Sequence, residues 1–311
     1  MSEFHHVSVL LNECIEALNI RPDGIYVDGT LGGAGHSSQI VKKLTTGRLI
    51  GIDRDTVALK AAGERLRPYQ DRVTLVHSNF SDMKQVLQDL GIPGVDGILL
   101  DLGVSSPQLD DAQRGFSYMA DAPLDMRMNS DDSLDAYQVV NSWSQEELKR
   151  ILYTYGEERY APQIAAAICR RREAASIATT LELVDVIRSA MPPAALREKQ
   201  HPAKRSFQAI RIAVNDELGA VERIMEDAIS LLNPGGRLAI ITFHSLEDRI
   251  VKTGMTNASK GCTCPPSFPI CVCGKKPKVK LISKKPIVSN QEELDANPRA
   301  RSAKLRVCER L

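Results

Sequence analysis

The stretch "YVDGTLGGAGHS", Tyr26–Ser37, decides how the fold is predicted, because a short apolar run there reaches an aspartate and breaks into glycines. The apolar run predicts a buried strand, and "GHSSQIVKKL" after it predicts a helix. Glycines between a strand and a helix let the backbone approach a ligand closely. Which ligand this turn holds is the question that the rest of the sequence answers.

The same alternation of strand and helix continues along the N-terminal part of the chain. The segments "GRLIGIDRD", "RVTLVHSNF" and "VDGILLDLG" predict three more strands, with helix-length periodic segments between them. This order predicts βαβ units and a parallel, doubly wound sheet. The run "ILLDLG" is apolar on both faces, which is typical of a central parallel strand covered by helices. The predicted class is therefore α/β.

The alternation stops after Leu109 and gives way to Arg-rich helical segments such as "APQIAAAICRRREAA". It resumes with a long helix, an "NPGG" turn and the apolar strand "RLAIITFHS". The tail "RSAKLRVCERL" alternates like a final edge strand. We predict one α/β domain over residues 1–109 and 213–311, interrupted by an inserted all-helical domain over residues 110–212.

Composition excludes several classes of protein. No apolar stretch approaches the ~18 residues that a membrane span needs. The N-terminus lacks the basic flank, apolar core and cleavage site of a signal peptide. Seven cysteines, an odd number, favour reduced thiols. We therefore expect a cytoplasmic protein with no membrane partner.

Charge is balanced overall but not locally. Lys and Arg number 40 against 39 Asp and Glu, so net charge alone indicates no nucleic-acid partner. Residues 259–291 contain no carboxylate, and such a basic segment fits either docking on an anionic surface or a solvated loop. Its lysines are Lys260, Lys275, Lys276, Lys278, Lys280, Lys284 and Lys285.

Three ligands compete for the glycine turn. A P-loop needs Lys and then Ser or Thr after its last glycine, but His36 and Ser37 follow Gly35. A dinucleotide turn needs G-x-G-x-x-G, which this spacing does not match, and the Asp28 carboxylate would oppose a pyrophosphate. S-adenosylmethionine (AdoMet) is cationic and carries no phosphate, so a carboxylate suits it. The turn favours AdoMet.

Further residues support a nucleoside ligand at the same edge of the sheet. Asp53 ends the second strand, where an acidic residue meets ribose hydroxyls for NAD and AdoMet alike. The later "NPGGRLAIITFHS" resembles the late turn and strand of class I AdoMet-dependent methyltransferases. Asp101 ends the fourth strand and belongs to the same rim. Phe80 either flanks the adenine or is an ordinary core aromatic.

A wider set of motifs resembles one family over nearly the whole chain. The segments are "SVLLNE", "DGTLGGAGHS", "LLDLGVSSPQLD", "RGFSY", "PLDMRM", "YGEERYA", "RSFQAIRIAVNDEL", "FHSLEDRIVK" and "NPRARSAKLRV", and together they are similar to the RsmH (MraW) family. The resemblance implies a Rossmann-like methyltransferase domain with a helical insertion. It also implies methylation of N4 of a cytidine in the decoding region of 16S ribosomal RNA, in the small subunit or a late assembly particle.

The resemblance also implies a set of site residues. The hydrogens on N4 would be accepted by Asp101 or by backbone carbonyls of the loop after it, a loop that lacks the Pro-Pro-aromatic motif of DNA amino-methyltransferases. His244 would contact the cytosine or a phosphate, or else be structural. Arg170, Arg171, Arg172, Arg299 and Arg301 are candidates for RNA contact. The implied AdoMet contacts are Ala34, Gly35, His36, Asp53, Phe80, Asp101 and Gln108.

Other interpretations stay open at this stage. The alternatives are a DNA amino-methyltransferase, another RNA base methyltransferase, an NAD-linked oxidoreductase, and an assembly factor without chemistry. Cys262, Cys264, Cys271 and Cys273 form C-x-C…C-x-C, which suits either a structural Zn²⁺ or free thiols in a loop. Because C-x-C is tighter than the usual spacing and the chemistry needs no metal, we expect none.

Overall fold

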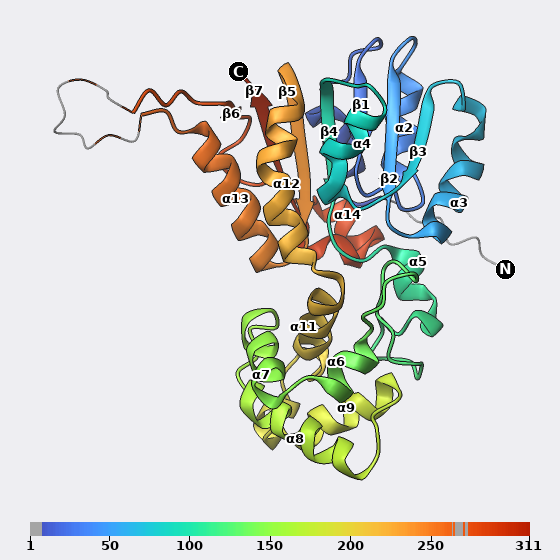
Figure 1. Ribbon diagram of the computed structural model, residues 1–311, viewed down its shortest axis with the longest axis vertical. Coiled ribbons are helices and arrows are strands. Elements are labelled where there is room, and N and C mark those ends of the chain that lie inside the picture. The colour runs from blue at the N-terminus through green and yellow to red at the C-terminus, as the bar shows by residue number, and fades with distance from the viewer. Residues whose placement is uncertain (1–7, 263, 265–269, 271–272) are drawn as a thin grey trace. The chain divides into compact units, whose positions relative to one another are not determined.

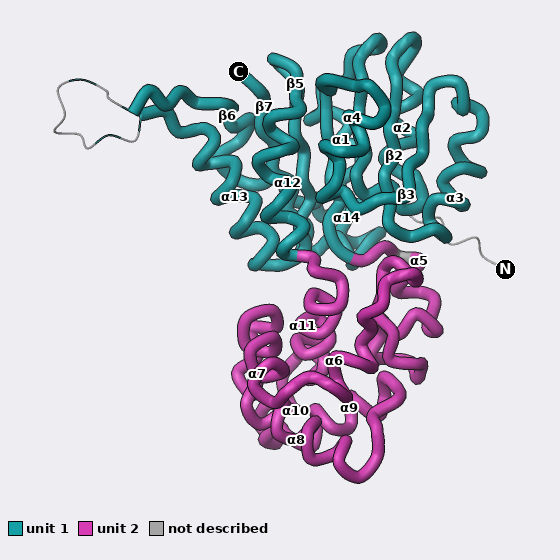
Figure 2. The backbone as a smooth tube through the Cα atoms, viewed as in Figure 1, with its two compact units in different colours: residues 1–103, 218–311 teal, residues 104–217 magenta. Residues whose placement is uncertain are grey.

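The computed structural model describes the chain except residues 1–7, 263, 265–269 and 271–272. The chain divides into two compact units, residues 1–103 with 218–311 and residues 104–217 (Figure 2). The boundaries therefore lie at 103/104 and 217/218, a few residues from those expected at 109/110 and 212/213. Within the described ranges, every helix is too short or too polar to span a bilayer.

The first unit is built on a single sheet in the described residues, with strand order β3-β2-β1-β4-β5-β7-β6. The strands from β3 to β5 are parallel, and β7 is antiparallel to both of its neighbours. This is a doubly wound class I methyltransferase fold, as predicted. The strands are β1 (Ile25–Asp28), β2 (Arg48–Asp53), β3 (Val73–His77), β4 (Val95–Asp101), β5 (Leu232–Thr242), β6 (Val279–Leu281) and β7 (Lys304–Arg310).

Helices cover both faces of this sheet (Figure 1). Neighbouring side chains of one strand alternate between the two faces. In β4, for example, Ile98 and Leu100 pack on one face and Leu99 on the other. The first face is covered by α4 (Met83–Asp89), α12 (Glu217–Leu231) and α13 (Ser245–Ser259), and the second by α1 (Leu11–Ala17), α2 (Gly35–Lys43) and α3 (Thr56–Leu66). The unit also contains α14 (Gln291–Ala296) and the 3₁₀ turns η1 (Arg67–Tyr69), η2 (Phe80–Asp82) and η4 (Pro298–Ser302).

Two details of the sheet differ from the prediction. The tail strand β7 is not at the edge, because it pairs with β5 on one side and with β6 on the other. The predicted "NPGG" turn lies inside β5, where the pairing with β4 shifts between Val95 and Gly97 and Gly235 has a φ of 79°. A left-handed glycine there takes up the irregularity without ending the strand.

The second unit is helical. Its core is formed by buried apolar side chains from several helices, among them Val139, Leu148, Ile164, Leu183 and Ile210. Its helices are α5 (Ser106–Asp110), α6 (Ala136–Ser142), α7 (Gln145–Thr154), α8 (Ala161–Ala174), α9 (Thr180–Ser189), α10 (Pro193–Leu196) and α11 (Lys204–Asn215), with the 3₁₀ turn η3 (Ala112–Arg114).

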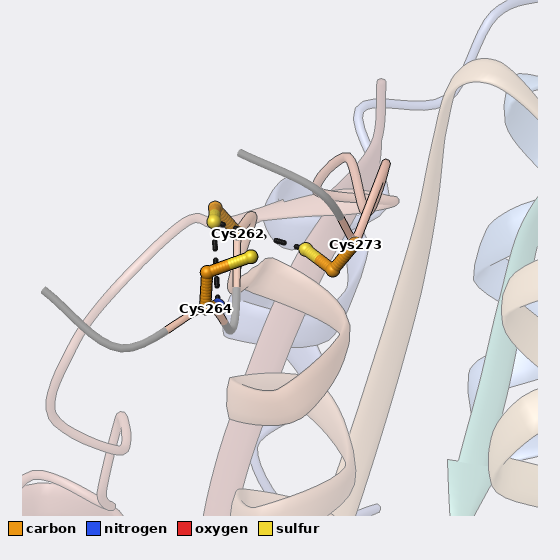
Figure 3. A group of neighbouring side chains, drawn as sticks. All are labelled: Cys262, Cys264 and Cys273. Atoms are coloured by element: carbon orange, nitrogen blue, oxygen red, sulfur yellow. Dashed lines mark hydrogen bonds between the residues drawn. The ribbon is translucent and has the colours of Figure 1, made fainter. Parts of the chain in front are cut away.

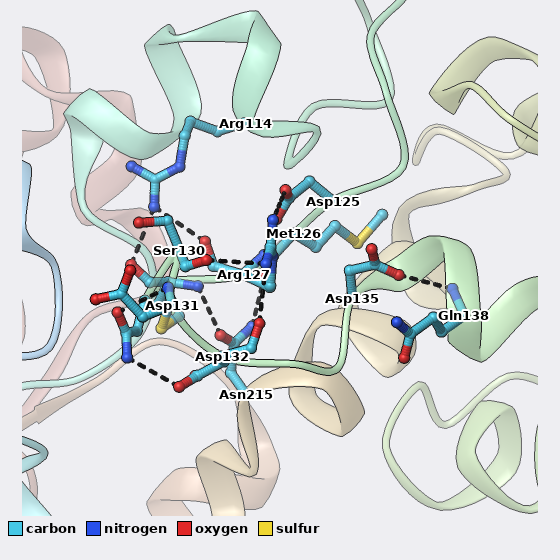
Figure 4. Close-up of polar contacts among 12 residues, drawn as sticks. Arg114, Asp125, Met126, Arg127, Ser130, Asp131, Asp132, Asp135, Gln138 and Asn215 are labelled. Atoms are coloured by element: carbon cyan, nitrogen blue, oxygen red, sulfur yellow. Dashed lines mark hydrogen bonds and ion pairs between the residues drawn. The ribbon is translucent and has the colours of Figure 1, made fainter.

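A polar network orders the long segment between η3 and α6 (Figure 4). Arg127 donates two hydrogen bonds to the Asp125 carboxylate, at 3.0 and 2.7 Å. The buried side chain of Asn215, at the end of α11, accepts from the Met128 N–H at 2.7 Å and donates to the Met126 carbonyl at 2.7 Å. The "PLDMRM" and "RIAVNDEL" motifs therefore bind one another inside this unit.

Candidate active site

Three aspartates end parallel strands at one edge of the sheet in the first unit. Asp28 ends β1, Asp53 ends β2 and Asp101 ends β4. The register pairs Asp28 with Gly51 and Leu99. Because parallel strands share a carboxyl edge, the three side chains belong to the edge at which such sheets bind ligands.

Asp28 is buried and organises the start of the glycine turn. Its carboxylate accepts hydrogen bonds from the Ser37 hydroxyl at 2.7 Å and from the Thr30 N–H at 3.2 Å. Burial raises the pKa of Asp28 to about 6, although these two hydrogen bonds oppose the shift. Asp28 thus ties β1 to both the turn and α2.

The backbone of the glycine turn is left-handed at two positions. Gly32 has a φ of 48°, and Ala34 has a φ of 57°, which is uncommon for a residue with a side chain. A Cβ placed on Gly33 would meet nothing within 4 Å, so the backbone there borders open space. A Cβ on Gly35, by contrast, would overlap the Ser8 hydroxyl. The turn is therefore closely packed at its helix end and open at Gly33.

Asp53 connects β2 to that turn. One carboxylate oxygen accepts a 2.7 Å hydrogen bond from the Gly32 N–H, and the other accepts one of 2.9 Å from the Asp55 N–H. Burial raises the pKa of Asp53, and these hydrogen bonds oppose the rise. Asp53 therefore fixes the position of the turn in addition to any contact with a ligand.

Asp101 has the most perturbed carboxyl group of the three. Its pKa is raised to about 8, first by burial and then by the negative charges of Asp28 and Glu247. The side chain is 26% exposed, yet its Oδ1 is buried and has no hydrogen-bond partner among the described residues. A partly exposed carboxyl with an unsatisfied oxygen is suited to a cationic or hydrogen-donating ligand.

His36 lies at the start of α2 beside Asp101. Its Nε2 is 3.0 Å from the Val9 carbonyl oxygen, and its Nδ1 is 3.8 Å from Oδ2 of Asp101. Since a carbonyl can only accept, Nε2 carries a proton and donates it to Val9. The ring is buried, and the hydrogen bond to Val9 holds it by Nε2, the nitrogen that does not lie toward Asp101.

The remaining expected cofactor residues occupy different places. Phe80 begins η2, half-buried, and its Cβ would lie 3.1 Å from a Cβ placed on Gly29. It therefore borders the turn, and it also packs against the hydrophobic core on that face. Gln108 belongs to the second unit, where its buried side chain accepts a hydrogen bond from the Ser105 N–H at 3.0 Å and caps α5.

His244 serves as the N-cap of α13. Its Nδ1 lies 3.5 Å from the Glu247 N–H, and its Nε2 lies 3.1 Å from Glu247 Oε1. Glu247 in turn accepts from the His244 N–H at 3.4 Å, which completes a capping box, and also from the Phe243 N–H at 2.9 Å. These contacts give His244 a structural role, while contact with substrate stays a prediction.

Glu247 is the site residue that sequence analysis did not single out. It is buried at the start of α13 and close enough to Asp101 for its charge to raise the pKa of that carboxyl. The spacing of His244 and Glu247 matches a capping box with His in place of Ser or Thr, and this pattern was the available signal.

The candidate RNA-contacting arginines differ in their hydrogen bonds and in their exposure. Arg171 donates to the Ala175 carbonyl at 2.7 Å and Arg172 to the Val140 carbonyl at 2.8 Å, so both hold structure within the second unit. Arg170 is exposed on α8, and Arg299 and Arg301 are exposed in η4. A shallow pocket of the second unit has Arg159, His201 and Arg205 among its lining residues.

Three of the four loop cysteines lie together. The sulfurs of Cys262, Cys264 and Cys273 are all within 4.8 Å of one another (Figure 3). Cys271 lies outside the described residues.

Known proteins resemble this chain over its full length. The model of the MraW methylase family matches residues 3–311. The chain belongs to the MraW methylase family. Among curated relatives, three proteins named ribosomal RNA small subunit methyltransferase H are similar to it. The protein from Brevibacillus brevis is 60% identical, with 99% of this chain and 98% of that protein covered. Those from Clostridium botulinum and Heliobacterium modesticaldum are 58% and 56% identical, with 99% of this chain and 100% and 99% of those proteins covered.

Solved structures are more distant. A putative rRNA methylase from Clostridium thermocellum is 11% identical with a TM-score of 0.45, and the match covers 98% of this chain and 100% of that one.

Membership of the MraW methylase family makes the chain a methyltransferase that uses AdoMet. The residues of the site fit this cofactor. Carboxylates, including Asp101 with its unsatisfied oxygen, attract a cationic ligand and repel a phosphate, and the turn has open space at Gly33.

Proposed function

We propose that this chain methylates the N4 amino group of a cytidine in the decoding region of 16S ribosomal RNA, in the bacterial cytoplasm. The observation that carries the proposal is the match over 99% of the chain, at 56–60% identity, to proteins named ribosomal RNA small subunit methyltransferase H. The small ribosomal subunit, or a late assembly particle, is the proposed form of the substrate.

We assign AdoMet to the carboxyl edge of the first unit. Ala34, Gly35 and His36 would hold it at the glycine turn, Asp53 at the ribose and Phe80 at the adenine. Asp101 would lie toward the methionyl end. When bound, AdoMet supplies a methyl group on a positively charged sulfur. Two observations support this assignment. The hydrogen bond from the Gly32 N–H to Asp53 orients the turn, and several carboxylates lie close together where a cationic ligand would bind.

Asp101 has the chemistry to assist the acceptor nitrogen. The N4 lone pair of cytosine is delocalised into the ring, so an acceptor for its hydrogens helps the nitrogen become tetrahedral and take up positive charge. The Asp101 side chain is 26% exposed, so it can offer an oxygen to such a hydrogen. The ionised carboxylate is the stronger acceptor, and the positive charge of AdoMet would lower the raised pKa that Asp101 has in the free chain.

Ribosomal RNA would meet exposed cations in both units. The seven lysines of residues 259–291 face no carboxylate within that segment. Two of them are paired elsewhere, Lys278 with Glu226 at 3.1 Å and Lys280 with Glu309 at 2.7 Å. Lys275, Lys276, Lys284 and Lys285 are exposed and suited to phosphates. In the second unit we assign this role to the exposed Arg170.

The experiment offers three substrates in parallel to the purified chain with methyl-labelled AdoMet. They are small subunits from cells lacking this protein, RNA extracted from those subunits, and double-stranded DNA. After digestion to nucleosides, label in N4-methylcytidine from subunits or their RNA supports the proposal. Label in another ribonucleoside, or in N4-methyldeoxycytidine from DNA, would overturn the base or the substrate and favour one of the alternatives.

A further inference from the structure

The segment between α13 and β6 has features that the methyl-transfer site does not explain. Its described residues form no helix or strand. The Lys278 N–H donates a 2.8 Å hydrogen bond to the Ala258 carbonyl, so the segment leaves and rejoins the fold at one place. Cys262, Cys264 and Cys273 lie near that base on both of its arms.

In contrast to the expectation from the C-x-C spacing, we propose that Cys262, Cys264 and Cys273 bind a Zn²⁺ ion. The Sγ atoms of Cys262 and Cys273 are 3.7 Å apart, and all three Sγ atoms are within 4.8 Å of one another (Figure 3). Sulfurs around a tetrahedral zinc, at the usual Zn–S distance of ~2.3 Å, lie about 3.8 Å apart. The separation observed between Cys262 and Cys273 therefore matches that of two ligands on one ion.

A disulfide does not account for this cluster. The 3.7 Å separation between the Cys262 and Cys273 sulfurs is far longer than the ~2.05 Å of an S–S bond, so these two sulfurs are not bonded to each other. Thiolates select zinc and other soft metals over magnesium or calcium, which prefer oxygen ligands. With three thiolates supplied by the chain, one position of a tetrahedral site is left for a fourth ligand.

The backbone around the sulfurs is arranged as in a metal-binding turn. The Cys264 N–H lies 3.4 Å from the Cys262 sulfur and donates to it, which helps to fix the position of that sulfur. Directly after Cys273, Gly274 has a φ of 62°, a left-handed conformation that turns the chain away from the ligand at little cost for glycine.

The surrounding charge also suits a thiolate-bound metal. Zn²⁺ with three thiolates has a net charge of −1, and no carboxylate lies between residues 259 and 291 to oppose it. Lys260, Lys275 and Lys276 stand within three residues of a ligand in the sequence. The bound metal would also hold Lys275 and Lys276 in one position on the surface.

The test measures the metal content of the untagged full chain, purified without chelators, by elemental mass spectrometry. We expect one zinc per chain in the wild type and none in Cys262→Ser or Cys273→Ser. Loss of a residue that hydrogen-bonds a metal ligand lowers metal affinity by ~10–100-fold, and loss of a ligand itself should lower it by more. Cys169→Ser, on α8 of the second unit, is the matched control and should keep the metal. Circular dichroism and AdoMet titration check that every variant is folded.

Substitution with Co²⁺ identifies the ligands directly. After zinc is removed, Co²⁺ should give a thiolate-to-metal charge-transfer band in the wild type and in Cys169→Ser, but not in Cys262→Ser combined with Cys273→Ser. The proposal is overturned if the wild type holds no zinc and gives no such band at excess Co²⁺. It is also overturned if the metal persists in the double variant, if Cys169→Ser loses it, or if iron with sulfide is found in place of zinc.

Discussion

Nδ1 of His36 lies 3.8 Å from Oδ2 of Asp101, so the first turn of α2 and the end of β4 meet at the carboxyl edge of the sheet. Because Nε2 of His36 donates to Val9, Nδ1 is the ring nitrogen that lies toward Asp101. Asp101 also experiences the negative charges of Asp28 and Glu247. The pKa of this one carboxyl therefore depends on side chains from β1 and α13.

The free energy of unfolding of the ligand-free chain should fall as pH rises through the range in which Asp101 is protonated in the folded chain but ionised in the unfolded chain. The unfolded chain releases this proton near 3.8 and the folded chain near 8, so the folded chain binds more protons in between. Asp28, with its pKa raised to about 6, adds to the same slope. Urea unfolding from pH 4 to pH 8 should give a flatter slope for Asp101→Asn. The exposed Asp89→Asn on α4 should follow the wild type, and equal slopes for all three would contradict the raised pKa.

Removal of the Asp53 carboxylate should weaken AdoMet binding. Asp53→Ala removes the acceptor of the Gly32 N–H and, under the proposed assignment, of the ribose hydroxyls. Hydrogen bonds to a charged group contribute about 1.5–3 kcal/mol, which corresponds to ~10–100-fold in Kd. Calorimetric titration measures this loss, and Asp89→Ala serves as the surface control. A Kd for Asp53→Ala within twofold of the wild-type value would remove Asp53 from the cofactor site.

The second unit should depend on Asn215. Asn215→Ala leaves the Met128 N–H and the Met126 carbonyl without their partner in a buried place, at a cost of about 1–3 kcal/mol for each. Urea unfolding followed by fluorescence of Trp143, which packs against the core of this unit, reports the loss. Asn257→Ala, exposed on α13, should change stability little. If both variants unfold alike, the network does not stabilise the unit.

The loop lysines should control the salt dependence of subunit binding. Each phosphate contact that is lost lowers the slope of log K against log salt by about 1. Lys275→Ala combined with Lys276→Ala should therefore lower the slope by up to ~2 and weaken binding at low salt. Lys42→Ala with Lys43→Ala, exposed on α2, is a control of equal charge. Identical slopes for the two double variants would exclude the loop lysines as specific contacts.

The sequence predicted the parts of the site that depend on local pattern. Asp28, Asp53 and Asp101 each follow an apolar run, and strands joined by helices are parallel, so their ends had to share an edge. Contacts between distant segments carry no such pattern. The alternation in β7 predicts a strand but does not specify its neighbours, and it pairs with both β5 and β6.

Charge and hydrogen bonding across the fold were also beyond the sequence. The effect of Glu247 on Asp101 depends on how α13 packs against the sheet, and Asn215 binds Met128 across 87 residues. His244 illustrates the same limit, because its position in the sequence does not show that it caps α13 together with Glu247. Residue types in the sequence therefore indicated which side chains belong to the candidate site. The role of each side chain could be inferred only once its hydrogen-bond and charge partners were known.

Asp101 gives the most direct test of the methyl-transfer site. Single-turnover transfer from labelled AdoMet to small subunits is measured for the wild type, Asp101→Asn and Asp89→Asn, each at saturating AdoMet. We expect Asp101→Asn to bind AdoMet but to form N4-methylcytidine ~10²–10⁴-fold more slowly, as for loss of a group that assists proton transfer. Asp89→Asn should match the wild type. Transfer by Asp101→Asn at the wild-type rate would contradict the assignment of Asp101 to the acceptor nitrogen.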